Sequence, residues 1–155
     1  MKDLTGKKYL AVTHQLTRTG APQVLFELLI MMRHAGAEID IIALDEGSLR
    51  SQFEAEGMPV RVEKDIFKRR EELLREWEKY DGAILNTLAS FEAAYVLNGS
   101  ELPVLWWIHE NGIYFDFLKT VLPDFAQLSH NIQVRSVSSL VQKEFRERYG
   151  IETDL

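Results

Sequence analysis

Short apolar runs alternate along the chain with longer segments of helical character, and this alternation constrains the fold most. Strands are expected at 9–13, 38–44, 59–63, 82–87, 103–109 and 132–137. Helical segments are expected at 21–35, 48–56, 66–80, 90–97, 116–128 (partly helical, broken by a proline) and 138–150. Strands that alternate with helices form a parallel sheet covered on both faces. We therefore predict a three-layer, Rossmann-like α/β fold with a mostly parallel sheet of about six strands.

Residues at the segment boundaries favour particular helix ends. Pro22 suits a first helical turn, where its missing N–H would be unpaired anyway. Ser48, Ser90 and either Ser138 or Ser139 are expected to cap the helices that follow them. The first helical segment is apolar on nearly every side, so we expect it to be buried nearly all round.

The composition is that of a single acidic globular domain. The chain has 155 residues, 46% of them hydrophobic and 27% charged, with a formal net charge of −6 and a pI of about 5.3. This charge argues against a nucleic-acid-binding domain, and the absence of cysteine excludes disulfides, thiolate metal sites and a thiol nucleophile. No signal peptide or membrane-spanning run is found, so a cytoplasmic protein is expected. The charged segment 63–80 mixes both signs, which favours a solvated face over peripheral membrane contact.

Polar residues follow the predicted strands, and they define where a ligand would bind. In open α/β sheets, ligands lie outside the carboxyl ends of the strands. The candidates at these ends are His14, Asn86, Thr87, His109, Glu110, Asn111 and Ser138, together with the loop residues Arg18, Thr19, Gly20 and Ala21.

The loop before the first helix has two interpretations. Free backbone amides and the helix dipole attract anions at a helix N-terminus, so a phosphate is expected over Gly20 and Ala21. Arg18 would add a positive charge. Alternatively, Thr19 simply caps the helix and Gly20 makes the turn.

The stretch "WWIHENG" gives a second candidate site. His109 is suited to hydrogen-bond a phosphate or a sugar hydroxyl, or to carry a proton. Alternatively, it pairs with Glu110 or a backbone carbonyl and only closes the loop. One of the two tryptophans is expected in the core.

Several well-known motifs are absent from the sequence. There is no G-x-G-x-x-G fingerprint, no Walker loop, no G-x-S-x-G elbow, no D-x-D pair and no H-E-x-x-H motif. These absences argue against a dinucleotide enzyme, a P-loop nucleotidase, a typical serine hydrolase and a zinc protease. We predict no metal and no cofactor.

An ordered set of motifs resembles the N-terminal domain of group 1 (family 4) glycosyltransferases. These motifs are "VTHQLTRTGAPQVLFELLIMMRHAGAEIDIIALDEGSLRSQFEAEGMPV", "NTLASFEAA", "WWIHE" and "QVRSVSSLVQKEFRERYGIET". The resemblance covers essentially the whole chain. It implies the GT-B architecture, in which two Rossmann-like domains face each other. Residues 1–155 would be the acceptor-side domain, without the C-terminal domain that holds the nucleotide-sugar and a glutamate pair.

The resemblance also implies roles for individual residues. The loop at Gly20 would face the donor phosphates, although Ala21 replaces the second glycine that is common in the family. His109 would contact the donor sugar or its phosphate. His14, Asn86, Thr87, Glu110, Asn111 and Ser138 would line the acceptor side of the cleft.

The resemblance implies that this chain is half of an enzyme. The complete enzyme would transfer a sugar from a nucleotide-sugar to a sugar or lipid-linked acceptor, with retention of configuration and without a metal ion. The fragment alone is expected to be inactive. The alternative is a stand-alone nucleotide- or sugar-binding module without catalysis. A flavodoxin-like or receiver domain is weaker, because residues 13–15 lack the acidic cluster of a receiver.

Overall fold

A six-stranded, all-parallel sheet forms the centre of the protein in a computed structural model that describes residues 3–155. The strands are β1 (Lys8–Thr13), β2 (Glu38–Ala43), β3 (Val60–Val62), β4 (Gly82–Asn86), β5 (Val104–Ile108) and β6 (Ile132–Ser136). Their spatial order is β3-β2-β1-β4-β5-β6. The predicted α/β class, the parallel sheet and the number of strands are confirmed.

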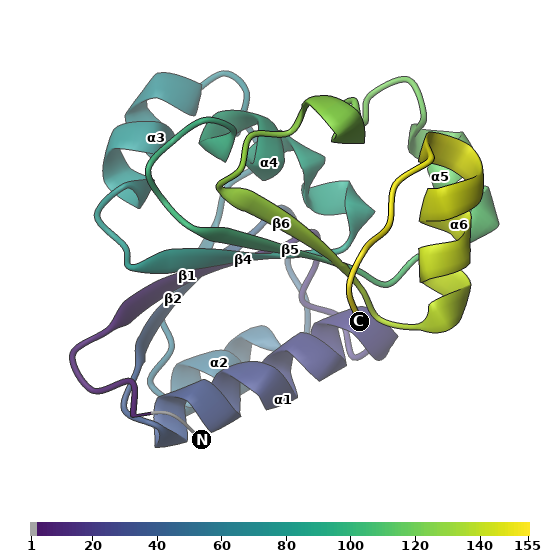
Figure 1. Ribbon diagram of the computed structural model, residues 1–155. Coiled ribbons are helices and arrows are strands. Elements are labelled where there is room, and N and C mark those ends of the chain that lie inside the picture. Colours follow the sequence, from purple (N-terminus) through teal and green to yellow (C-terminus); the bar gives the residue numbers. More distant parts are fainter. Residues whose placement is uncertain (1–2) are drawn as a thin grey trace.

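Helices cover both faces of this sheet, with α1 and α2 on one face and α3 and α4 on the other (Figure 1). The α-helices are α1 (Gly20–His34), α2 (Arg50–Ala55), α3 (Arg70–Trp77), α4 (Phe91–Leu97), α5 (Gly112–Leu118) and α6 (Ser139–Tyr149). Two short 3₁₀ turns are η1 (Leu88–Ser90) and η2 (Phe125–Gln127). Within residues 3–155, no helix is long and apolar enough to cross a membrane.

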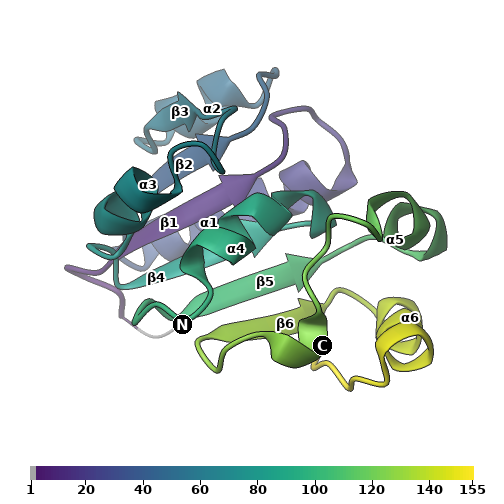
Figure 2. The ribbon, with the colours of Figure 1, turned by 90° about the horizontal axis from the view of Figure 1, so that it is seen from above.

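The strand order reverses between β1 and β4, and this reversal positions the ligand edge. The chain runs outward from β1 to β3 on one side and from β4 to β6 on the other. Thr13 and Asn86 are partners in the register, so the loops after β1 and β4 leave the sheet side by side. The strands point toward α5 and α6 at this edge (Figure 2). Ligands of open α/β sheets bind at such a switch point.

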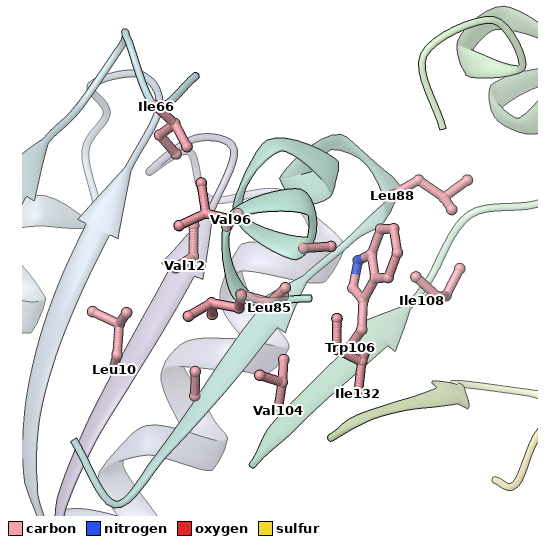
Figure 3. Packing of buried hydrophobic residues seen from close by; sticks show 14 of the residues in the cluster. Leu10, Val12, Ile66, Leu85, Leu88, Val96, Val104, Trp106, Ile108 and Ile132 are labelled. Atoms are coloured by element: carbon pink, nitrogen blue, oxygen red, sulfur yellow. The ribbon is translucent and has the colours of Figure 1, made fainter. Parts of the chain in front are cut away.

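The larger of two hydrophobic clusters joins the sheet to residues of α3, α4, α5 and α6, and Figure 3 shows part of it. Trp106 is fully buried in it and stacks on Phe125 with 5.3 Å between ring centroids. Its neighbour Trp107 faces the other way and is half-buried, since successive side chains of a strand alternate between faces. The prediction that one of the two tryptophans lies in the core is confirmed.

Three predicted helix starts are wrong. The fifth helix begins at Gly112 rather than 116, because the chain turns into a helix directly after the short loop that follows β5. Helix α2 begins after Leu49, and Ser48 makes no cap. The charged segment becomes helical only at Arg70, because residues 66–69 form turns.

Of the two serines predicted to cap α4 and α6, only the one before α6 makes a capping hydrogen bond. Ser138 caps α6, with its Oγ accepting a hydrogen bond from the Val141 N–H at 3.4 Å. Ser90 precedes α4 but does not cap it, because its buried hydroxyl donates to the Asn86 carbonyl at 2.7 Å. That bond instead ties the 3₁₀ turn to the end of β4.

Helix α1 is not buried all round, contrary to the expectation. Val24 is 37% exposed and Met31 49% exposed. Near them, Leu28 and Met32 border a groove of about 680 Å³ at the amino ends of β4 to β6, here called the amino-edge groove. Its other lining residues are Tyr9, Asp81, Gly82, Ala83, Ile84, Ser100, Glu101, Pro103, Val104, Leu105, His130, Asn131 and Gln133.

Candidate functional site

A cavity of about 360 Å³ opens at the carboxyl edge of the sheet, where β1, β4 and β5 end. We call it the carboxyl-edge cavity. Its lining residues are His14, Gln15, Thr19, Ala21, Pro22, Thr87, His109, Glu110, Asn111 and Tyr114. Seven of these ten were candidates from the sequence, so the structure brings together side chains that are up to 97 residues apart (from His14 to Asn111).

The N-terminus of α1 presents free amides to this cavity. Thr19 occupies the N-cap position but makes no capping hydrogen bond, and its Oγ1 lies 2.9 Å from Thr17 Oγ1 instead. Pro22 has no N–H to offer. In the described part of the chain, no hydrogen bond reaches the N–H groups of Gly20 and Ala21. The simple capping interpretation therefore lacks its hydrogen bond, and these amides remain available to an anion.

His109 lies in the cavity wall with one ring nitrogen buried and unpartnered. Among residues 3–155, no group hydrogen-bonds to its Nε2. Its ring packs on Trp107 with 4.6 Å between centroids, and burial lowers the pKa of His109 to about 4. The imidazole is therefore neutral at pH 7, and it can give or accept one hydrogen bond at Nε2.

Glu110 does pair with His109, but through the backbone rather than the ring. Its Oε2 accepts hydrogen bonds from the N–H of His109 at 3.1 Å and of Leu88 at 3.0 Å. The carboxylate thereby ties the loop after β5 to the loop after β4. Burial raises the pKa of Glu110, while these donors act in the opposite direction.

Thr87 is the most constrained residue of the site. It has φ +78° and ψ 162°, and within residues 3–155 it is the only non-glycine residue with a positive φ. This conformation is costly for a β-branched side chain. Its N–H donates to the Trp107 carbonyl and its carbonyl accepts from the indole of Trp106, both at 2.8 Å. Its Oγ1 lies 3.0 Å from Nδ1 of His14.

Gly20, which begins α1 between two lining residues, is not itself among the residues that line the cavity. Three further candidate residues do not line it either. Arg18 reaches the Gln52 amide on α2, with Nε 2.9 Å from the oxygen when that amide is oriented as an acceptor. Asn86 is fully buried and donates to Thr13 Oγ1 at 3.4 Å. Ser138 caps α6. Contacts of these three residues with a ligand remain predictions.

The sequence interpretation missed Gln15, Pro22 and Tyr114 as lining residues. Tyr114 was hidden because the start of α5 was placed four residues too late, which made its segment look like a loop. Arg148 of α6 ties α5 to α6. Its guanidinium donates hydrogen bonds to Asp116 of α5 at 2.5 Å and to Glu144 of α6 at 2.6 Å.

The cavity offers N–H groups and neutral imidazoles, which suit an anion and hydroxyl groups. No group of three or more histidine and carboxylate side chains in residues 3–155 is arranged to hold a metal ion. The metal independence of the site remains a prediction.

Comparisons with known proteins point in the same direction. A model of the family described as Glycosyl-transferase family 4 matches residues 5–152. The fold is similar to crystal structures of Anabaena Alr3699/HepE. The complex with UDP and glucose has a TM-score of 0.71 and 15% identity over 91% of this chain and 41% of that chain. The complex with UDP has a TM-score of 0.71 and 17% identity over 90% of this chain and 40% of that chain.

The chain spans about two fifths of the length of these solved structures. No curated protein matches it significantly. The family match, by contrast, extends over nearly all of the 155 residues. The chain therefore belongs to glycosyltransferase family 4.

Proposed function

We propose that this chain is the N-terminal, acceptor-side half of a GT-B glycosyltransferase. The complete enzyme transfers a sugar from a nucleotide-sugar donor to an acceptor, with retention of anomeric configuration and without a metal ion. A C-terminal domain supplies most of the donor site, so residues 1–155 alone carry out no transfer. The family match and the resemblance to an enzyme crystallised with UDP and glucose support this proposal.

One observation carries the proposal most directly. Ala21, whose N–H is unpaired, and His109, whose Nε2 has no partner among residues 3–155, line one cavity at the switch point of the sheet, and Gly20 with its unpaired N–H directly precedes Ala21. Negative charge develops on the diphosphate as the sugar leaves. Fixed N–H dipoles at a helix N-terminus stabilise such charge without having to reorganise.

His109 contributes through its neutral ring. Because burial keeps the pKa near 4, the imidazole is neutral at pH 7 and acts through a hydrogen bond rather than through charge. It hydrogen-bonds the donor sugar or its phosphate and holds the anomeric carbon in place. Closure of the second domain over this wall would exclude water from the reacting groups.

The acceptor is expected to approach past α5. Tyr114 of this helix lines the cavity, while Ile113 and Phe117 on the same helix are each 80% exposed. Exposed apolar side chains beside a polar site favour an acceptor with an apolar part, such as a lipid-linked sugar. His14 and Asn111 would face its hydroxyl groups.

A stand-alone binding module is the second candidate, because the free amides and both histidines come from this chain alone. If the chain is such a module, residues 1–155 should bind a nucleotide or a sugar with measurable affinity in the absence of a second domain. Micromolar binding of UDP-glucose by residues 1–155, with no transfer in any assay, would favour this candidate.

A pair of substitutions at Gly20 tests the anion site. Gly20→Pro removes one amide N–H at the first helical position, which proline favours. Thr19 before it is extended (φ −97°, ψ 171°), and a Cβ at Gly20 meets nothing within 4 Å. The fold should therefore tolerate proline. Gly20→Ala is the matched control, because it keeps the amide.

We expect Gly20→Pro to weaken UDP-glucose binding about tenfold, the loss of one hydrogen bond to a charged group. Gly20→Ala should bind as the unmodified chain does. Calorimetry or NMR titration measures both variants. Equal affinity of the two variants would remove the α1 amides from the donor site.

A further inference from the structure

Glu110 presents one carboxylate oxygen to the backbone and the other to the carboxyl-edge cavity. Its Oε2 accepts hydrogen bonds from the N–H groups of His109 at 3.1 Å and of Leu88 at 3.0 Å. In the described part of the chain, no hydrogen bond reaches Oε1. The buried side-chain atoms without a partner there belong to Trp77, Asn86 and His109, so Oε1 is accessible in the cavity that Glu110 lines.

Two backbone groups from different loops fix this carboxylate. Leu88 begins the 3₁₀ turn after β4, and His109 directly follows β5. Because both donors hold the same oxygen, the side chain has lost most of its rotamer freedom before a ligand arrives. A group that is ordered in advance binds without a further loss of conformational entropy, which is the general advantage of preorganisation.

The chemistry of the free oxygen decides which ligand group it can hold. An ionised carboxylate can only accept hydrogen bonds, so the group at Oε1 must carry a hydrogen, as a sugar hydroxyl does. A phosphate has the wrong charge, because the carboxylate repels it. The N-terminus of α1 has the opposite preference, since Ala21 lines the same cavity and its unpaired N–H suits an anion. The cavity therefore has a donor end at α1 and an acceptor end at Glu110.

We propose that Glu110 is a specificity-determining residue whose Oε1 accepts a hydrogen bond from a sugar hydroxyl, while the diphosphate lies at the N-terminus of α1. The inference rests on the proposed function, since it states how the same cavity orients a nucleotide-sugar. The reversed orientation would bring the diphosphate to the carboxylate, and like charges oppose it. The sugar can belong to the donor or to the acceptor, because both meet Oε1 through the same hydroxyl chemistry.

Glu110→Gln separates sugar recognition from support of the loop. The glutamine oxygen can accept the same two N–H groups, whereas its NH₂ group takes the place of Oε1 and can only donate. The variant therefore keeps the loop and loses the acceptor, and NMR signals of the His109 and Leu88 amides report whether both bonds remain. Glu101→Gln is the matched control, because it removes one negative charge from the amino-edge groove at the opposite edge of the sheet.

Calorimetry at pH 8 compares the affinities for UDP, UDP-glucose and glucose. This pH keeps Glu110 ionised although burial raises its pKa. We expect Glu110→Gln to lower the affinity for UDP-glucose relative to UDP about tenfold, the loss of one hydrogen bond to a charged group. Glu101→Gln should leave this ratio unchanged. If Glu110→Gln keeps the ratio and weakens glucose binding, the hydroxyl at Oε1 belongs to the acceptor sugar.

An unchanged ratio together with unchanged glucose binding in Glu110→Gln overturns the proposal. If this variant does not fold, the ¹³C signal of the Glu110 carboxylate in the unmodified chain decides. It should move with UDP-glucose or with glucose and stay in place with UDP, and a signal that neither sugar moves overturns the proposal as well.

The Gly20 amide separates this inference from the proposed function. If UDP moves that amide while Glu110→Gln changes neither the ratio nor the glucose affinity, the inference is wrong and the proposed function stands. If neither UDP nor UDP-glucose moves the Gly20 amide, the proposed function fails, and glucose binding alone decides the role of Glu110.

Discussion

The two cavities of this domain differ in chemistry more than in size. The amino-edge groove has a volume of about 680 Å³ and the carboxyl-edge cavity about 360 Å³. The groove is lined mainly by apolar residues such as Leu28 and Leu105, with polar residues such as Asp81 and Asn131 among them. The smaller cavity contains unpaired helix amides, an unpartnered histidine nitrogen and a threonine with positive φ.

The two cavities differ in how much backbone strain and how many unpaired polar groups lie beside them. Backbone strain and unpaired polar groups each cost on the order of 1–3 kcal/mol and lower the stability of the fold. Among the described residues, the strained Thr87 and the unpartnered Asn86 Oδ1 and His109 Nε2 lie at the carboxyl edge, where three loops converge, while the unpartnered Trp77 indole belongs to α3. Volume alone would select the amino edge, whereas the unpaired polar groups and the backbone strain favour the edge that the strand order also indicates.

Two glycines, one at each edge, are expected to give the largest contrast. A Cβ at Gly47 would collide with the backbone carbonyl of Leu16, which holds the loop after β1. A Cβ at Gly82 would meet the Tyr9 ring at 3.2 Å, which can move, and the Pro103 carbonyl at 3.4 Å. Gly47→Ala should lower the free energy of unfolding by about 3 kcal/mol and Gly82→Ala by much less, as measured by denaturant titration. Equal losses would mean that the two edges are equally rigid.

The two fully buried tryptophans should give a smaller contrast. The indole N–H of Trp106 donates to the Thr87 carbonyl, while that of Trp77 has no partner among residues 3–155. Both lose similar area on substitution by phenylalanine, but Trp106→Phe also removes a buried hydrogen bond and leaves the Thr87 carbonyl with the Ser90 N–H alone, at 3.3 Å. We expect Trp106→Phe to cost about 1 kcal/mol more than Trp77→Phe in thermal or denaturant unfolding. A smaller loss for Trp106→Phe than for Trp77→Phe would mean that this bond does not support the site.

The histidines of the carboxyl edge should make folding sensitive to acid. Unfolded histidine binds a proton near pH 6.5, whereas folded His109 does so only near pH 4. Between these values the unfolded state holds more protons, so stability is full above pH 6.5 and falls as the pH drops toward 4. Glu110 acts in the opposite direction because its pKa is raised in the folded state.

A pH series of unfolding curves for the unmodified chain and His109→Gln isolates this effect. The variant should lose less stability between pH 7 and pH 5. An NMR titration of His109 should give a midpoint near 4. A midpoint at the ordinary value would mean that the ring is solvated and that its unpartnered nitrogen is not buried.

The sequence was sufficient for the parts of this edge that depend on local pattern. Alternation of strands and helices placed His14, Thr87 and His109 at strand ends, and parallel strands bring such ends together. The positions of Thr19 and Ala21 followed from the helix predicted to begin at Ala21, with Pro22 in its first turn.

Features that depend on tertiary contacts could not be predicted. The positive φ of Thr87 arises from hydrogen bonds to β5, which no local pattern encodes. The same holds for Glu110, whose carboxylate binds two backbone groups, one of them 22 residues away. Arg18 suited an anion site by charge, but its length lets it reach Gln52 on α2.

Backbone amide shifts on addition of UDP-glucose, assigned residue by residue, decide whether the carboxyl edge binds the donor. We predict shifts at Gly20, Ala21 and His109, with Gly82, Leu105 and Gln133 of the amino-edge groove unmoved. Shifts confined to the groove residues would contradict this prediction, and the ligand site would then lie at the opposite edge of the sheet.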